Sequence, residues 1–311
     1  MSPPNCSFAE VNTLVGILQM AVHIPTFILG LVLNLLAIRG FSTFLKRRWL
    51  EYASTSIYMI NLAVFDLLLV LSLPFKMLLS RDTISLPSLC TMAESFYFIS
   101  MYGSVFTISF ISLDRYLAMQ YPFLVSSLRS PRKILMTCGV IWLLVWAGSI
   151  PVYSFHGKME GFKCFNNLSD STWSADIVFP LEVFGFLLPL GIIGFCSSKS
   201  IHILLGRQGH TQDWVQQRAC ICTIAVSLAV FVISFLPVHL GIFLQFLVRN
   251  GFILECRAKQ NISLFLKLSL CLSNFNCCLD VFCYYFVIKE FRVGIVAHRP
   301  SRSQDTTVTR A

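Results

Sequence analysis

The sequence predicts an all-α membrane protein, namely a seven-transmembrane helix bundle with a short amphipathic eighth helix. Hydrophobic residues make up 56% of its 311 positions and charged residues only 13%, whereas a soluble domain carries about 25% charged residues. Seven stretches of the chain are also long and apolar enough to cross a bilayer. The net charge of +9 fits basic cytoplasmic loops in so apolar a chain, and we expect no nucleic-acid partner.

Each of the seven stretches is close to the length of about 20 helical residues that a bilayer core requires. Four of them contain no charged residue, and the other three contain one acid each, which is Asp66, Glu182 or Asp280. Strands of a membrane β-barrel would be shorter and would alternate in polarity, which these stretches do not. The seven stretches, each bounded by charged residues, are residues 11–38, 52–75, 95–113, 134–157, 177–198, 219–248 and 268–288, and one spanning helix is expected within each.

The distribution of basic residues predicts the orientation in the plasma membrane. Sixteen Lys and Arg residues fall in the loops 1–2, 3–4 and 5–6 and in the C-terminal tail, against six on the other face. This excess marks the cytoplasmic side, so residues 1–13 form an extracellular segment and residues 14–286 the bundle. Ile288, Phe291 and Ile295 recur at helical spacing, which predicts an amphipathic helix over 287–298 on the inner leaflet. Residues 299–311 form the cytoplasmic tail.

Glycosylation sequons provide an independent check of this orientation. They begin at Asn5, Asn167 and Asn261, and all three fall on the predicted outer face, where N-glycosylation occurs. At the other end of the chain, the tail carries hydroxyl residues that we expect to be a phosphorylation cluster for arrestin, the alternative being a disordered polar tail. They are Ser301, Ser303, Thr306, Thr307 and Thr309.

Four of the twelve cysteines lie at or beyond the outer boundary, in an oxidising compartment. Cys90 opens the third span and Cys164 lies within the 4–5 loop, so a bridge between them would pin this loop over the mouth of the bundle. Cys6 and Cys256 either tie the N-terminal segment to the 6–7 loop or remain free thiols. The other eight cysteines lie in the spans, where small apolar side chains pack.

Ionisable residues at membrane depth are candidates for function because burying them is costly. Asp66 and Asp280 would need a cation between them, or a shared proton, if they occupy one site. We expect a sodium site there, and the alternative is a hydrogen-bonded water cluster with one acid protonated; no other cofactor or metal is expected. The predicted sodium ligands are Asp66, Ser104, Asn276 and Asp280.

Several motifs in several spans, taken together, identify the chain as a member of the rhodopsin-like receptor family. The resemblance covers essentially the whole chain and implies a receptor that activates a heterotrimeric G protein, not an enzyme. Pro237 in the sixth span matches the family's kink, about which this helix would swing outward. The matching motifs are Gly30 with Asn34, Asn61-Leu62-Ala63 with Asp66, Cys90, Asp114-Arg115-Tyr116, Trp142 and Pro189.

This resemblance also implies the residues that switch the receptor. A packing core of Val105, Pro189 and Phe231 relays motion from Phe235, which stands where most members have tryptophan. Arg115 and Tyr284 then line the crevice for the G protein. Ser197 and Gln217 replace a helix-5 tyrosine and a helix-6 acid, and Val281 replaces the usual helix-7 proline. Without that acid, Arg115 is expected to pair mainly with Asp114, and we expect basal signalling.

The outer half of the bundle suggests a ligand with an anionic head and an apolar chain. Tyr97 occupies the place of the amine-binding aspartate of amine receptors, and Asn274 that of the retinal lysine of opsins. Lys76 could bind the head, although it could instead pair with Glu94, and Arg249 could instead reach lipid headgroups. The expected cationic rim is Lys76, Lys163, Arg249 and Lys267, and the shaft beneath it is Tyr97, Phe98, Tyr102, Phe155, Phe184, Phe235, His239 and Phe243.

Within the family, residues 56–76, 153–158 and 280–285 and the sixth span through His239 resemble a purinergic-like branch that senses lysophosphatidylinositol. The resemblance implies this lipid as ligand and coupling to twelve/thirteen-class G proteins and Rho, with the Gq class as a further partner. A nucleotide ligand would use the same cationic rim and remains open. A transporter would show inverted repeats, which the sequence lacks, and no nucleophile–base set or metal cluster suggests an enzyme.

Overall fold

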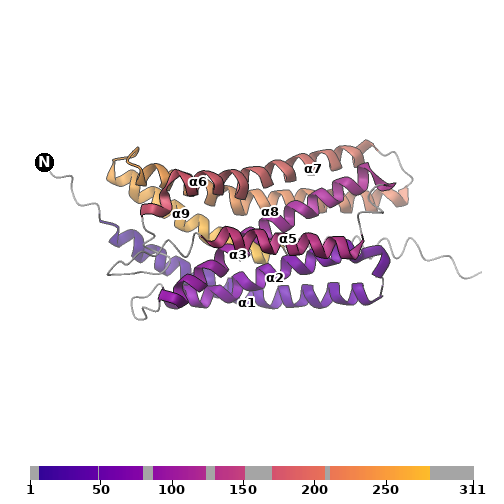
Figure 1. Ribbon diagram of the computed structural model, residues 1–311, viewed down its shortest axis with the longest axis horizontal. Coiled ribbons are helices and arrows are strands. Elements are labelled where there is room, and N and C mark those ends of the chain that lie inside the picture. Colours follow the sequence, from indigo (N-terminus) through magenta and orange to yellow (C-terminus); the bar gives the residue numbers. More distant parts are fainter. Residues whose placement is uncertain are drawn as a thin grey trace, which may run out of the picture.

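The computed structural model describes residues 7–47, 49–79, 87–123, 130–150, 170–206 and 211–280. All regular elements in these ranges are helical, and they run roughly along one common axis (Figure 1). The elements are α1 (Ala9–Arg47), α2 (Trp49–Leu79), α3 (Pro87–Gln120), α5 (Pro131–Ser149), η2 (Asp170–Trp173), α6 (Ala175–Glu182), η3 (Val183–Leu187), α7 (Leu188–Gly206), α8 (Thr211–Arg249) and α9 (Cys256–Asn274).

These elements provide seven segments that are long and apolar enough to span a bilayer, which confirms the predicted bundle. The segments are Val11–Lys46, Ser54–Leu78, Ser88–Gln120, Pro131–Ser149, Ala175–Gly206, Gln217–Arg249 and Cys256–Asp280. Large apolar side chains such as Leu36, Leu143 and Ile233 are more than half exposed, as expected where a helix faces lipid. The predicted eighth helix at 287–298 lies outside the described residues.

The fifth span differs from a plain α-helix. It consists of α6, the five-residue π-helix η3 and α7, in direct succession. Pro180 lies inside α6, and Pro74 and Pro237 likewise lie inside continuous helices. A π-helix inserts an extra residue into a turn and is often found at functional sites. The spacing of residues in this span did not predict the π-helix, which changes the residues of the span that face the bundle.

Helix α3 runs obliquely through the bundle, from the side of α1 and α2 toward α7 (Figure 1). Its approach to α2 depends on Gly103, because a Cβ atom there would lie 2.3 Å from the ring of Phe65. Phe65 in turn stacks on Trp142 of α5, with ring centroids 4.2 Å apart. The Trp142 indole N–H donates to Asn61 Oδ1 (3.0 Å), and the Asn61 amide donates to Thr107 (2.9 Å). Packing and hydrogen bonds thus join α2, α3 and α5 at mid-depth.

Helix α1 approaches α2 and α9 at the motif residues Gly30 and Asn34. A Cβ atom on Gly30 would lie 2.6 Å from Val70 of α2, so only glycine fits here without a shift. The Asn34 amide donates to the carbonyl oxygens of Gly30 (2.9 Å) and Cys277 (3.0 Å). The predicted close helix approach at Gly30 is therefore confirmed, and small residues are what membrane helices use for it.

Candidate functional site

Lys76 is a buried cation in the outer half of the bundle. Its side chain is only 6% exposed, and its ammonium nitrogen lies 4.2 Å from the centroid of the Tyr97 ring on α3. A cation over the face of an aromatic ring is attracted by the ring quadrupole, more strongly when it is desolvated. One turn outward on α3, a carboxylate oxygen of buried Glu94 lies 3.6 Å from the Cys90 sulfur. This end of α2 and α3 therefore concentrates charge inside an apolar bundle.

The two outer cysteines in the described ranges, Cys90 and Cys256, are each disulfide-bonded. Their predicted partners, Cys164 and Cys6, lie outside the described residues, so the two pairings stay predictions. Asn261 is exposed near the start of α9, while Asn5 and Asn167 also lie outside the described residues.

Another group of polar side chains lies between α1 and α9, and the sequence analysis did not predict this group. His23 is 1% exposed, and its Nε2 atom lies 3.0 Å from the side-chain nitrogen of Asn274. The Cys271 sulfur lies 4.0 Å from the same imidazole nitrogen. A histidine within a long charge-free stretch was the available signal, but its partner on α9 could not be deduced from spacing.

The expected aromatic shaft is only partly assembled. Phe231 and Phe235 of α8 are buried with ring centroids 5.2 Å apart, and His239 stacks on Phe186 of η3 at 4.4 Å. Val105 of α3 and Pro189 of α7 are buried beside them. Phe98 is half-buried against Tyr97.

Other expected members of the shaft and rim lie elsewhere. Phe243 is 39% exposed and Phe184 62% exposed, because their helix faces point away from the interior. Lys267 donates a hydrogen bond of 2.6 Å to Asn12 of α1, and Arg249 is exposed at the end of α8. Phe155 and Lys163 lie outside the described residues. Among the cations expected at the rim, Lys76 is thus the one whose described contacts point into the bundle.

The four candidate sodium ligands form two hydrogen-bonded pairs at mid-depth, and all four are buried. The Ser104 hydroxyl donates to Asp66 (3.2 Å), and the Asn276 amide donates to Asp280 (2.9 Å). Among the described residues, nothing hydrogen-bonds to the second carboxylate oxygen of Asp280 or to the amide oxygen of Asn276, and both atoms are buried. Oxygen atoms of this kind are suitable ligands for a hard cation, so the residues fit a sodium ion.

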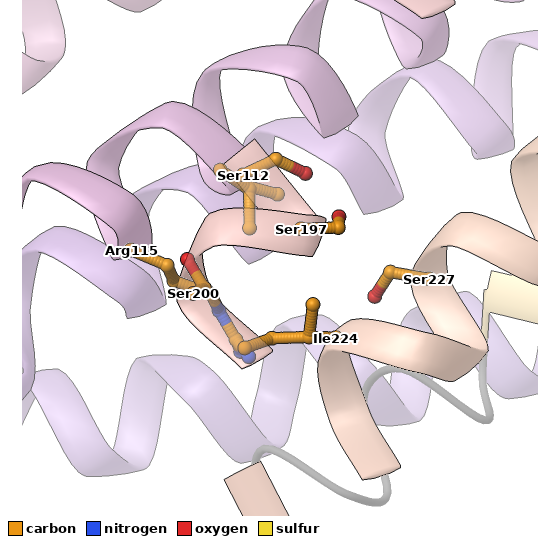
Figure 2. Close-up of a pocket in the computed structure, with 7 residues that line it drawn as sticks. Ser112, Arg115, Ser197, Ser200, Ile224 and Ser227 are labelled. Carbon is orange, nitrogen blue, oxygen red and sulfur yellow. The ribbon is translucent and has the colours of Figure 1, made fainter. Parts of the chain in front are cut away.

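At the end of the bundle opposite Lys76, Arg115 of α3 reaches into a small cavity between α3, α7 and α8. Figure 2 shows its side chain running past Ser200 toward Ile224. The cavity has a volume of about 10 Å³, close to the minimum that one water molecule needs. The Ser200 hydroxyl is buried and has no hydrogen-bond partner. The remaining lining residues are Ile111, Ser112, Ser197 and Ser227.

The Gln217 side-chain amide donates to the backbone carbonyl of Leu204, so it links α8 to α7. The expected pairing of Arg115 with Asp114 stays a prediction. Tyr116 packs edge-on against Phe195 of α7, with centroids 5.7 Å apart. Arg115 thus faces hydroxyl groups of α7, which is the environment that Ser197 and Ser200 create in place of a tyrosine.

The comparison with known proteins agrees with this arrangement. Residues 33–284 match the model of the 7 transmembrane receptor (rhodopsin family). The chain is 73% identical to the human protein named G-protein coupled receptor 55 over 310 residues, covering 98% of this chain and 97% of that protein. Identity to the mouse protein of the same name is 68% over 326 residues, covering both chains fully. Human lysophosphatidic acid receptor 4 is 33% identical over 283 residues, covering 88% of this chain and 75% of that receptor.

The chain therefore belongs to the rhodopsin family of seven-transmembrane receptors. Members of this family are receptors that act through heterotrimeric G proteins and are not enzymes, so the expected class is confirmed. Tyr284 and the expected phosphorylation cluster at residues 301–309 lie outside the described residues.

Proposed function

We propose that this receptor lies in the plasma membrane with its N-terminus outside and is activated by an extracellular anionic lysolipid, lysophosphatidylinositol. The observation that carries this proposal is Lys76, a cation held over the Tyr97 ring inside the bundle. A phosphate bound there gains charge-assisted hydrogen bonds in a low-dielectric surrounding. An acyl chain adds roughly 0.8 kcal/mol for each buried CH₂ group. The named lysophosphatidic acid receptors among the relatives support the same ligand class.

We propose that the ligand acts by shifting the population of two states. Its contacts in the outer half would favour the state in which α8 swings outward about Pro237. Phe235 and Phe231, which belong to the same buried cluster as Val105, would transmit this change together with the buried Pro189. Arg115 would then help to form the crevice for a twelve/thirteen-class or Gq-class G protein, and arrestin would bind the phosphorylated tail.

We further propose that sodium binds between the Ser104–Asp66 and Asn276–Asp280 pairs and favours the resting state. The ion would supply the positive charge that two buried carboxylates need in order to ionise together. The partnerless oxygens of Asp280 and Asn276 support this assignment. If water fills the site instead, ligand affinity should not depend on the sodium concentration.

The ligand proposal is tested by competition binding to the purified receptor. Lysophosphatidylinositol and a nucleoside diphosphate would each compete with a labelled lysolipid, on wild type and on Lys76→Ala. We expect the lysolipid to displace the label and Lys76→Ala to weaken its affinity about 10-fold or more, because a charged hydrogen bond contributes about 1.5–3 kcal/mol. Exposed Lys199→Ala on α7 is the matched control. Unchanged affinity in Lys76→Ala at equal surface expression would contradict the assignment, and displacement by the nucleotide would favour that ligand class.

A further inference from the structure

A further buried polar cluster, separate from those described above, lies where α6, α3 and α8 meet, and it is built around Glu182. Its Oε2 atom lies 3.2 Å from Nδ1 of His239 on α8. The imidazole ring lies edge-on to Tyr102 of α3, with ring centroids 6.0 Å apart. His239 is 1% exposed, Tyr102 8% and Glu182 12%. Three helices therefore each direct one polar side chain to the same buried place.

This cluster has hydrogen-bonding capacity that the described residues leave unused. Glu182 Oε1, His239 Nε2 and the Tyr102 hydroxyl are all buried without a hydrogen-bond partner. A buried polar atom without a partner costs about 1–3 kcal/mol, so three together need an external partner. A carboxylate oxygen accepts hydrogen bonds, an imidazole nitrogen donates or accepts according to its tautomer, and a hydroxyl does both. Such a set is complementary to hydroxyl groups, which also donate and accept.

The backbone of the fifth span is shaped to form this cluster. The π-helix η3 begins directly after Glu182. The ring of its residue Phe186 stacks on the imidazole ring of His239. Gly185 of the same turn faces Tyr102, because a Cβ atom there would lie 2.8 Å from the tyrosine ring. The extra residue of the π-turn and the missing side chain of Gly185 thus allow the acid and the tyrosine to approach one another.

We infer that Glu182, His239 and Tyr102 form a subsite for the hydroxyl groups of the ligand headgroup, and that this subsite selects a polyol-bearing lysolipid over one with a bare phosphate. The inference rests on the proposed lysolipid function and deepens it. Tyr102 lies five residues beyond Tyr97 on α3, which is about 7.5 Å along the helix. A headgroup with its phosphate at Lys76 and its polyol ring directed inward would extend toward this subsite, and the ring would then occupy the part of the shaft that was expected to hold the apolar chain.

The test uses two lysolipids with the same acyl chain, lysophosphatidylinositol and lysophosphatidic acid, which differ by the inositol ring. Affinities of both are measured on purified wild type, Glu182→Gln and Tyr102→Phe. Both substitutions keep the shape of the side chain. Asp176→Asn is the matched control, because Asp176 is an exposed acid on the same helix. We expect each subsite variant to lower the affinity for lysophosphatidylinositol about 10-fold and to change that for lysophosphatidic acid less than about 2-fold.

The outcomes separate the subsite from the function on which it rests. If both variants lower the two affinities equally, or change neither, the cluster is structural or hydrated and the subsite is wrong. If Lys76→Ala loses binding while Glu182→Gln leaves the ratio of the two affinities unchanged, only the subsite fails. If wild type binds neither lysolipid, the proposed function and the subsite are both overturned.

Discussion

Buried polar side chains are arranged differently in the half of the bundle that contains Lys76 and in the half that contains Arg115. In the outer half, charged and ring side chains meet in defined pairs, such as Lys76 over Tyr97 and Glu182 beside His239. In the cytoplasmic half, one arginine faces several serine hydroxyls around a cavity with space for about one water molecule. Defined pairs favour one geometry and are suited to selecting a ligand. Small hydroxyls around a long flexible cation allow several geometries and are suited to a switch.

The largest effect should come from Arg115 and should be confined to signalling. Arg115→Ala removes the cation that reaches between α3, α7 and α8, so we expect agonist-stimulated nucleotide exchange on added G protein to fall at least about 100-fold. The affinity for the lysolipid, measured without G protein, should change less than about 3-fold, because the ligand contacts remain and no bound G protein is present to contribute its coupling free energy. An equal loss of binding and exchange would mean that the two halves are not separate.

The site around Asp66 and Asp280, which lies between the two halves, is tested by the effect of sodium on agonist affinity. We expect sodium chloride to lower agonist affinity about 5-fold or more relative to choline chloride in wild type, in the range of ordinary allosteric couplings. Asp280→Asn keeps the shape of the side chain but removes one of the two buried charges, so this dependence should disappear. Asp176→Asn, an exposed acid far along another helix, should retain it. A sodium dependence that survives in Asp280→Asn would rule out this site.

A smaller effect is expected at the cytoplasmic ends of α7 and α8. Gln217→Glu cannot donate to the Leu204 carbonyl, but it restores an acid at the position where other members of the family often have one. If the missing acid is what leaves the resting state weakly held, exchange without ligand should fall about 2- to 5-fold, the range of a partly exposed ion pair. The measurement compares wild type, the variant and receptor-free membranes at matched expression. Basal exchange equal to that of receptor-free membranes in wild type would contradict the expectation of basal signalling.

Much of the fold could be predicted because its signals are local to each helix. Apolar stretches of span length with at most one charged residue predicted the seven helices, and Gly30 with Asn34 predicted a close helix approach that the structure contains. The family could be recognised because its motifs occur in a fixed order. These signals depend on composition and spacing along one segment, and both can be read directly from the residues.

The pairings between helices could not be predicted in the same way. Glu182 was visible as the single acid of its span, but the helix face on which it lies depends on the π-turn that follows it. His23 was visible as the histidine of a long charge-free stretch, but its contact with Asn274 depends on how α1 and α9 are rotated. Phe243 and Phe184 were expected inside and are exposed because their rotational positions, not their chemical type, decide the face they occupy.

One joint at mid-depth has a mechanical consequence. Gly103 admits the Phe65 ring against α3, this ring lies flat on Trp142, and the indole is tied to Asn61 and Thr107. Sliding α2, α3 or α5 past one another would break a ring stack and two hydrogen bonds at once. These three helices therefore form the fixed frame of the molecule. When a ligand pushes on the outer end of the bundle, we therefore expect these three helices to stay in place and α7 and α8, which form the opposite wall, to move.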